Sequence, residues 1–131
     1  MKYGAIDIGS NAMRLLIAEV VTFKNHNHIK KQQLIRVPVR LGENVFDNGI
    51  ITQQKIDKLI HSIQAFTLLM KVYDVSDFMA CATSAMREAE NGADVAAQVK
   101  AATGVDITII DGKDEADFIH STFETSGLDL S

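Results

Sequence analysis

Apolar residues in the first 41 positions fall in short runs separated by polar turn residues, a pattern typical of β-strands. The runs predict strands over residues 3–8, 14–23 and 29–41. A turn cluster, Gly9-Ser10-Asn11, separates the first two strands, and a polar tip over residues 24–28 separates the next two. Successive strands joined by turns predict an antiparallel meander.

The hydrophobic period changes after a loop predicted over residues 42–49. Thr52 is suited to cap a helix, and the apolar positions that follow it have the spacing of one amphipathic helix face. These positions are Ile56, Leu59, Ile60, Ile63, Phe66 and Met70. This stripe predicts a long helix with one buried side.

The rest of the chain alternates between strand and helix patterns. A short apolar strand is predicted over 75–82, a helix over 93–103 closed by Gly104, and a strand over 105–110. Asp111 is predicted to cap a last helix that runs to about residue 125. The order β-β-β-α-β-α-β-α indicates an α/β fold, a mixed sheet with helices as in a ribonuclease-H-like lobe, with the last strands parallel to the first.

Composition narrows the class of protein. The 131 residues favour one domain, and 47% apolar with 23% charged residues is ordinary for a globular chain. A net charge of −4 excludes a broadly basic nucleic-acid binder, and a single cysteine excludes a disulfide framework. No run reaches the roughly 20 apolar residues of a membrane helix, and no signal peptide is visible, so we expect a cytoplasmic protein.

The turn after the first strand is the first candidate site. It stands between two strands, which excludes a Walker loop and a dinucleotide-binding turn because both need a following helix. Gly9 would allow close backbone approach, consecutive amides would form an anion nest, and Ser10 and Asn11 would add donors. Asp7 would hold a metal ion or orient a water. The alternative is an ordinary hairpin turn.

Two further segments follow predicted parallel strands, where α/β sheets place their sites. In Ala82-Thr83-Ser84-Ala85-Met86-Arg87-Glu88-Ala89-Glu90-Asn91-Gly92, Arg87 could bind phosphate or simply pair with Glu88 or Glu90. In Ile109-Ile110-Asp111-Gly112-Lys113-Asp114-Glu115-Ala116, Asp114 is readily explained by the helix dipole. Glu115 could instead act as a general base on water.

Together the three segments resemble the exopolyphosphatase/guanosine pentaphosphate phosphohydrolase family, over roughly residues 3–125. They are similar to its Asp-x-Gly-Ser-Asn-Ser loop, its Thr-Ser-Ala-x-Arg-Glu-Ala-x-Asn-Gly segment and its Ile-Ser-Gly-x-Glu-Glu-Ala segment. The resemblance implies a lobe of the actin-like/Hsp70/sugar-kinase superfold. It also implies hydrolysis of terminal phosphate from polyphosphate or guanosine pentaphosphate, with Mg²⁺ as the expected cation.

Position by position, the resemblance implies that Gly9, Ser10, Asn11 and Arg87 bind phosphate. Asp7 would hold the metal, and Glu115 would activate the attacking water. The departures from the family pattern are Ala12, Asp111 and Asp114. The family's second loop, Asp-x-Gly-Gly-Gly-Ser, does not occur before Ser131. We therefore expect residues 1–131 to form a truncated first lobe that folds, does not turn over, and can pair as a homodimer.

Two other functions stay open. An ATP-dependent kinase or ATPase of the same superfold would fit the first loop alone, and a non-catalytic domain could bind a polyanion or a partner. Arg36, Arg40 and Lys113 could line a polyanion path or be scattered surface cations. His26 and His28 are better explained by a solvated turn than by a metal site.

Overall fold

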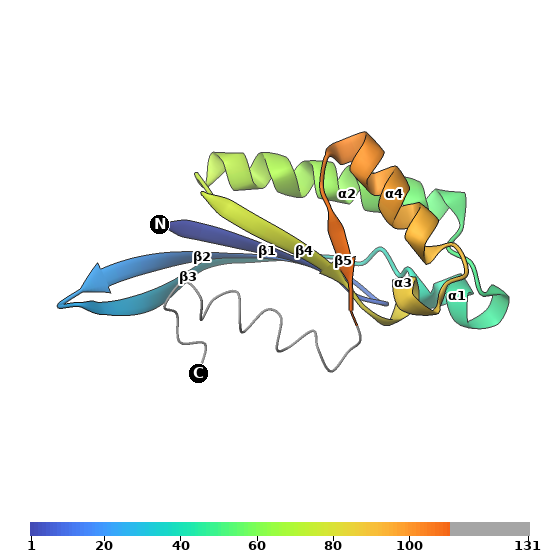
Figure 1. The fold of residues 1–131 in the computed structure, drawn as a ribbon, viewed down its shortest axis with the longest axis horizontal. Coiled ribbons are helices and arrows are strands. Elements are labelled where there is room, and N and C mark those ends of the chain that lie inside the picture. Colours follow the sequence, from blue (N-terminus) through green and yellow to red (C-terminus); the bar gives the residue numbers. More distant parts are fainter. Residues whose placement is uncertain (111–131) are drawn as a thin grey trace.

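The computed structural model describes residues 1–110, which form a five-stranded sheet with helices (Figure 1). The strands are β1 (Lys2–Ile8), β2 (Met13–Phe23), β3 (His26–Val37), β4 (Asp77–Ala82) and β5 (Ile107–Ile109). The helices are α1 (Gly42–Asn48), α2 (Gln53–Val72), α3 (Ser84–Glu88) and α4 (Gly92–Thr103). The last predicted helix, from Asp111 to about residue 125, lies outside the described residues.

The sheet has the order β3-β2-β1-β4-β5, and its pairing confirms the expected mixed topology. β1 pairs antiparallel with β2, and β2 pairs antiparallel with β3, as the meander predicts. β4 lies parallel to β1 on its other side, and β5 lies parallel to β4. The carboxyl ends of β1, β4 and β5 therefore meet at one edge, next to α1 and α3 (Figure 1).

The core lies between the sheet and the two longer helices, α2 and α4, which cover the same face (Figure 1). Ile6 and Ile8 of β1 and Leu15 and Ile17 of β2 are buried there. The helical stripe predicted after Thr52 is confirmed, because its members are buried apart from the half-buried Ile60. The Thr52 hydroxyl accepts the Lys55 amide at 3.4 Å and caps α2.

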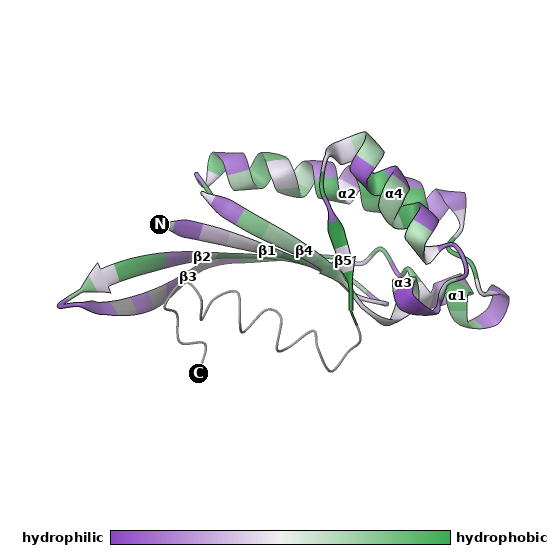
Figure 2. Ribbon diagram, in the orientation of Figure 1, coloured by the Kyte–Doolittle hydropathy of each residue, from purple (hydrophilic) through white to green (hydrophobic). Residues whose placement is uncertain are grey.

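The edge strand β3 begins three residues earlier than predicted. The predicted polar tip is a two-residue turn, in which Lys24 and Asn25 take φ of 52° and 64°. β2 and β3 stay paired up to Phe23 and His26. Apolar alternation missed this end because β3 is hydrophilic along much of its length (purple in Figure 2), as suits an exposed edge.

Two short helices were predicted as loops. The segment 42–49 contains α1 (Gly42–Asn48), which is capped by Gly49 with φ of 76°, and the segment after β4 contains α3. Each helix is too short to show a hydrophobic period. β4 and β5 are also shorter than the predicted 75–82 and 105–110. Gly104 ends α4 in the left-handed region, as predicted. None of the helices in residues 1–110 is both long and apolar enough to cross a membrane.

Candidate functional site

The turn between β1 and β2 lies at the edge where the parallel strands end. The Gly9 amide donates to the Ala12 carbonyl oxygen at 3.0 Å and closes the turn. A Cβ at Gly9 would lie 3.0 Å from that same oxygen, so the tight turn explains the glycine. The amides of Ser10 and Asn11 donate to no acceptor within residues 1–110. These two amides are therefore available to an anion.

Asp7, at the end of β1, is a buried carboxylate with two different oxygens. It pairs across the sheet with Arg14, whose Nε donates to Asp7 Oδ2 at 3.0 Å while a terminal nitrogen binds the same oxygen. Oδ1 is buried and has no hydrogen-bond partner within the described residues. Buried carboxylate oxygens are normally satisfied. Asp7 therefore has one oxygen bound by Arg14 and one without a partner among the described residues.

The segment after β4 joins the first turn through its serine. The Thr83 amide donates to the Ile8 carbonyl oxygen at 3.2 Å, which continues the β1–β4 pairing. The Ser84 and Ser10 hydroxyl oxygens lie 2.5 Å apart in a hydrogen bond. Ser10 and Ser84 are 74 positions apart in the chain, so this bond brings the first two candidate segments into one site.

Asn91 and Gly92, at the end of the second segment, hold its backbone in place. The Asn91 side chain accepts the Ile51 amide and donates to the Ile51 carbonyl oxygen, both at 2.9 Å. A Cβ at Gly92 would clash with the carbonyl oxygen of Met86. These two residues of the motif therefore have a structural reason, which is to fix α3 and α4 against the start of α2.

Arg87 lies on α3 and reaches the end of β5. Its guanidinium donates to the Ile110 carbonyl oxygen at 3.2 Å and lies 3.6 Å from a Glu88 carboxylate oxygen. The expected alternative, a pairing with Glu88, is thus present, and the phosphate contact of Arg87 stays a prediction. The guanidinium also lies where the third segment begins. Asp111, Lys113, Asp114 and the predicted general base Glu115 are outside the described residues.

The loop from β3 to α1 is fastened to the first turn by backbone hydrogen bonds. The Arg40 amide donates to the Asn11 carbonyl oxygen, and the Gly42 amide donates to that of Ser10, both at 2.9 Å. Arg40 has φ of 58°, a left-handed conformation that is unusual for a residue with a side chain. The Glu43 carboxylate binds Lys55 Nζ at 3.0 Å. The hydrogen bond and charge of Lys55 lower the pKa of Glu43.

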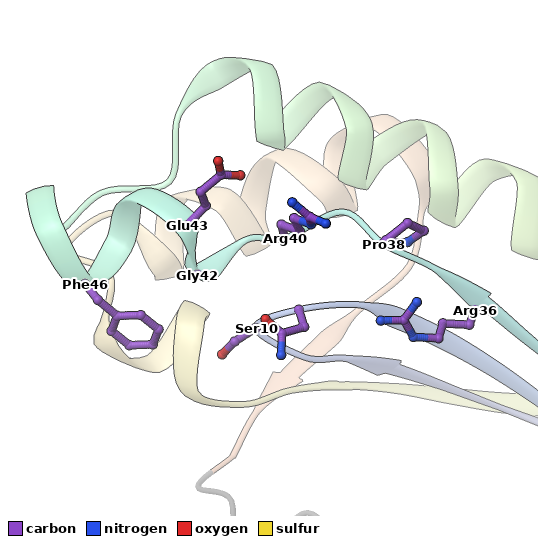
Figure 3. Close-up of a pocket in the computed structure, with 8 residues that line it drawn as sticks. Ser10, Arg36, Pro38, Arg40, Gly42, Glu43 and Phe46 are labelled. Carbon is purple, nitrogen blue, oxygen red and sulfur yellow. The ribbon is translucent and has the colours of Figure 1, made fainter.

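Two open pockets share a wall at this edge. The inner pocket, about 280 Å³, is lined by Asp7, Arg14, Arg36, Thr83 and residues 9–12. The outer pocket, about 660 Å³, is lined by Ser10, Asn11, Arg36, Pro38, Arg40, Gly42, Glu43 and Phe46 (Figure 3). Ser10, Asn11 and Arg36 line both pockets. Figure 3 shows Arg36 pointing toward Ser10, while the Glu43 carboxylate points away from Ser10.

Sequence reasoning placed Asp7, the first turn and the second segment at one edge, and the structure brings these residues together. It gave no role to Arg14 or Ser84 and treated Arg36 and Arg40 as equally well explained by scattered surface charge. Arg14 could have been found, because Asp7 and Arg14 are symmetric about the turn and so must be cross-strand neighbours. Ser84 and Arg36 carry no such signal, because their placement depends on long-range strand register.

The strand order and the loop cluster at its parallel-strand edge define a lobe of the actin-like or ribonuclease-H-like superfold, as predicted. Residues 20–126 match the Ppx/GppA phosphatase family. The chain belongs to this family, and the resemblance stated from its three segments is confirmed.

Relatives and solved structures agree with this assignment. The chain is 34% identical over 116 residues to Exopolyphosphatase 1 of Mycobacterium tuberculosis, covering 88% of this chain and 33% of that protein. It resembles the structure of the Aquifex aeolicus Ppx/GppA phosphatase, with TM-score 0.78 and 27% identity over 86% of this chain and 36% of that one. An exopolyphosphatase from Cytophaga hutchinsonii gives TM-score 0.79 and 26% identity, over 89% and 36%. The chain thus spans about a third of these relatives' length.

Proposed function

We propose that the intact protein is a phosphohydrolase that releases terminal phosphate from inorganic polyphosphate or guanosine pentaphosphate. Membership of a phosphatase family and the exopolyphosphatases among its relatives support this class of reaction. The observation that carries the proposal for this chain is the convergence of two segments on the inner pocket. The Ser10–Ser84 hydrogen bond joins them, and Asp7, whose Oδ1 has no partner among the described residues, lines the same pocket as Ser10.

The proposed reaction is in-line attack of water on the terminal phosphorus. The water oxygen forms a bond to phosphorus as the bond to the bridging oxygen breaks, and the leaving chain takes that electron pair. Glu115 accepts the proton of the water. The free amides of Ser10 and Asn11, the Ser10 hydroxyl and the Arg87 guanidinium stabilise the phosphoryl charge. Gly9 contributes by keeping the turn tight.

Asp7 fits the role of a Mg²⁺ ligand. Mg²⁺ is commonly held by one or two carboxylates together with substrate phosphates and water, and no larger acidic or histidine cluster is found within residues 1–110. Oδ1 is the free oxygen, because Arg14 occupies Oδ2. When bound, the cation would neutralise phosphate charge that would otherwise repel this carboxylate. A reducing, cytoplasmic location is consistent with the single buried thiol, Cys81.

The proposal is tested by measuring phosphate release by the intact protein in Mg²⁺ with polyphosphate, guanosine pentaphosphate or ATP. We expect release from one or both of the first two. We expect Glu115→Gln to lower kcat by about 100-fold or more, in the range of positioned general bases. Glu90→Gln, which changes an exposed carboxylate just after α3, is the matched control.

Two results would contradict the proposal. Equal phosphate release by Glu115→Gln and the unmodified protein would remove Glu115 as the base. Tight ATP binding with phosphoryl transfer to a small acceptor, and no polyphosphate hydrolysis, would place the protein among the kinases of the superfold instead.

A further inference from the structure

The outer pocket continues the inner pocket along the sheet edge. Because Ser10, Asn11 and Arg36 line both, a chain-like ligand whose end lies in the inner pocket would pass these three residues into the outer one. The outer pocket's volume of about 660 Å³ falls within the range of about 300–1,000 Å³ typical of ligand sites.

Two arginines give this wall positive charge. Arg36 and Arg40 are both exposed, and neither forms a salt bridge within the described residues. The carboxylate of the outer pocket, Glu43, forms its ion pair with Lys55, and the charge of Arg40 acts on it more weakly. Arg36 also stands directly opposite Arg14 in the β2–β3 pairing. Like charges opposite one another destabilise a sheet. Asp7 already offsets the charge of Arg14, and a bound anion would do the same for Arg36.

Backbone hydrogen bonds hold the loop that carries Arg40 against the first turn. Arg40 has a left-handed backbone conformation, and its amide donates a hydrogen bond to the Asn11 carbonyl oxygen. The Gly42 amide donates to the Ser10 carbonyl oxygen. A Cβ at Gly42 would lie 2.9 Å from the Phe46 ring and 3.1 Å from Ser10 Cβ, so the loop packs directly on the turn. A strained residue held beside a candidate site is a feature of preorganised ligand sites.

We propose that the outer pocket binds the phosphates that follow the reacting one in an oligophosphate chain, through Arg36 and Arg40. This inference rests on the proposed function for the direction of the chain. It assigns Arg40 to substrate affinity rather than to the chemical step, because Arg40 lines the outer pocket and not the inner one. Arg36, which lines both pockets, would bind the chain where it passes from one to the other.

The test is calorimetric binding of long-chain polyphosphate to the intact protein in EDTA, so that metal-assisted hydrolysis does not consume the ligand. We expect Arg36→Gln and Arg40→Asn each to weaken polyphosphate binding about tenfold, the scale of one charge-assisted hydrogen bond. Asn tolerates the left-handed conformation, so Arg40→Asn removes the charge without forcing the loop to change. Lys71→Gln, an equal charge change on an exposed residue at the end of α2, should stay within about twofold.

Inorganic phosphate separates the two pockets. Its affinity for the inner pocket should be unchanged in Arg40→Asn, since Arg40 lines the outer pocket and not the inner one, whereas Arg36 lines both. Unaltered polyphosphate binding in both variants, or an equal loss of phosphate and polyphosphate affinity in Arg40→Asn, would overturn the assignment. Weakened polyphosphate binding by a protein that releases no phosphate would support the outer pocket and contradict the proposed hydrolysis, so the two failures are distinguishable.

A third binding measurement distinguishes inorganic polyphosphate from the phosphates of a nucleotide. Phe46 is 64% exposed and lines the far part of the outer pocket (Figure 3). If a nucleotide base follows the phosphates, Phe46→Ala should weaken the binding of guanosine pentaphosphate and leave the binding of polyphosphate unchanged, because only the base can stack on the ring. If Phe46→Ala binds both ligands as tightly as the unmodified protein does, the pocket binds the phosphate chain alone.

Discussion

At the scale of single residues, the second segment combines two kinds of constraint. The Ser84 hydroxyl bonds that of Ser10 in the first turn, and Arg87 donates to the carbonyl oxygen of Ile110, just after β5. In contrast, the Asn91 side chain binds the backbone of Ile51, and Gly92 packs against the backbone of Met86. The residues of one motif therefore need not all bind substrate, since some of them hold the backbone in place. Its last two residues fix the position from which its first residues face the pocket.

Gly92→Ala is expected to destabilise the protein. Alanine favours a helix over glycine by about 1 kcal/mol, so it would stabilise α4 if the site were open. The clash with the Met86 carbonyl oxygen outweighs this gain, and we expect a net loss of about 3 kcal/mol in the free energy of unfolding. Urea unfolding of the purified protein measures it.

Gly104→Ala is the matched control for that substitution. A Cβ at Gly104 meets nothing within 4 Å, so only its φ of 80° opposes alanine, at about 1 kcal/mol. A Gly92 variant that is no less stable than the Gly104 variant would show that α3 and α4 can move apart without loss.

At the scale of elements, prediction succeeded where the sequence pattern was long. The stripe of α2 repeats over several turns, and the residues of β1 and β2 that face the helices are apolar, so their types follow from periodicity. In contrast, α1 has only 7 residues, of which Val45 has a buried side chain. β3 is a polar strand at the edge of the sheet. Their structure is decided by tertiary contacts, such as Gly42 on Ser10, that no local pattern contains.

The link between α1 and α2 predicts a measurable titration. Lys55 binds the Glu43 carboxylate and also donates to the Val39 carbonyl oxygen at 3.1 Å. Because Lys55 favours the ionised form, the pKa of Glu43 lies below its ordinary value of 4.5. The resulting stabilisation is fully present above the ordinary value, and it is lost as the pH falls through the lowered pKa.

We expect Lys55→Met to raise the pKa of Glu43 toward its ordinary value, followed by NMR titration of the side-chain carboxyl carbon. Methionine keeps the half-buried aliphatic stem and removes the charge. Lys58→Met is the control, since Lys58 is the weaker influence on Glu43 and should shift its pKa less. A larger shift in the Lys58 variant would contradict the assigned contact.

At the scale of the whole molecule, the site is made by strand order. The first turn, the β3–α1 loop and the segment after β4 are far apart in sequence, and all lie where β1 and β4 end. The sequence could predict this edge, because parallel strands align their carboxyl ends. It could not predict the two pockets, because Arg36 reaches them through a register that shifts at a bulge between Ile17 and Ala18.

The most direct test of the central claim compares two identical substitutions at opposite ends of the sheet. Asp7 lies at the carboxyl end of β1, and Asp77 is an exposed residue at the start of β4 that pairs with Tyr3. Phosphate release from polyphosphate by the intact protein in Mg²⁺ should fall about 100-fold or more in Asp7→Asn, the scale of a lost electrostatic contact in the transition state. Asp77→Asn should stay within about twofold.

Thermal unfolding of both variants, followed by circular dichroism, establishes that the comparison is made between folded proteins. The account predicts a folded Asp7→Asn variant with little phosphate release. A folded Asp7→Asn variant that releases phosphate as fast as Asp77→Asn would contradict it, because the inner pocket would then not be where the phosphate reacts.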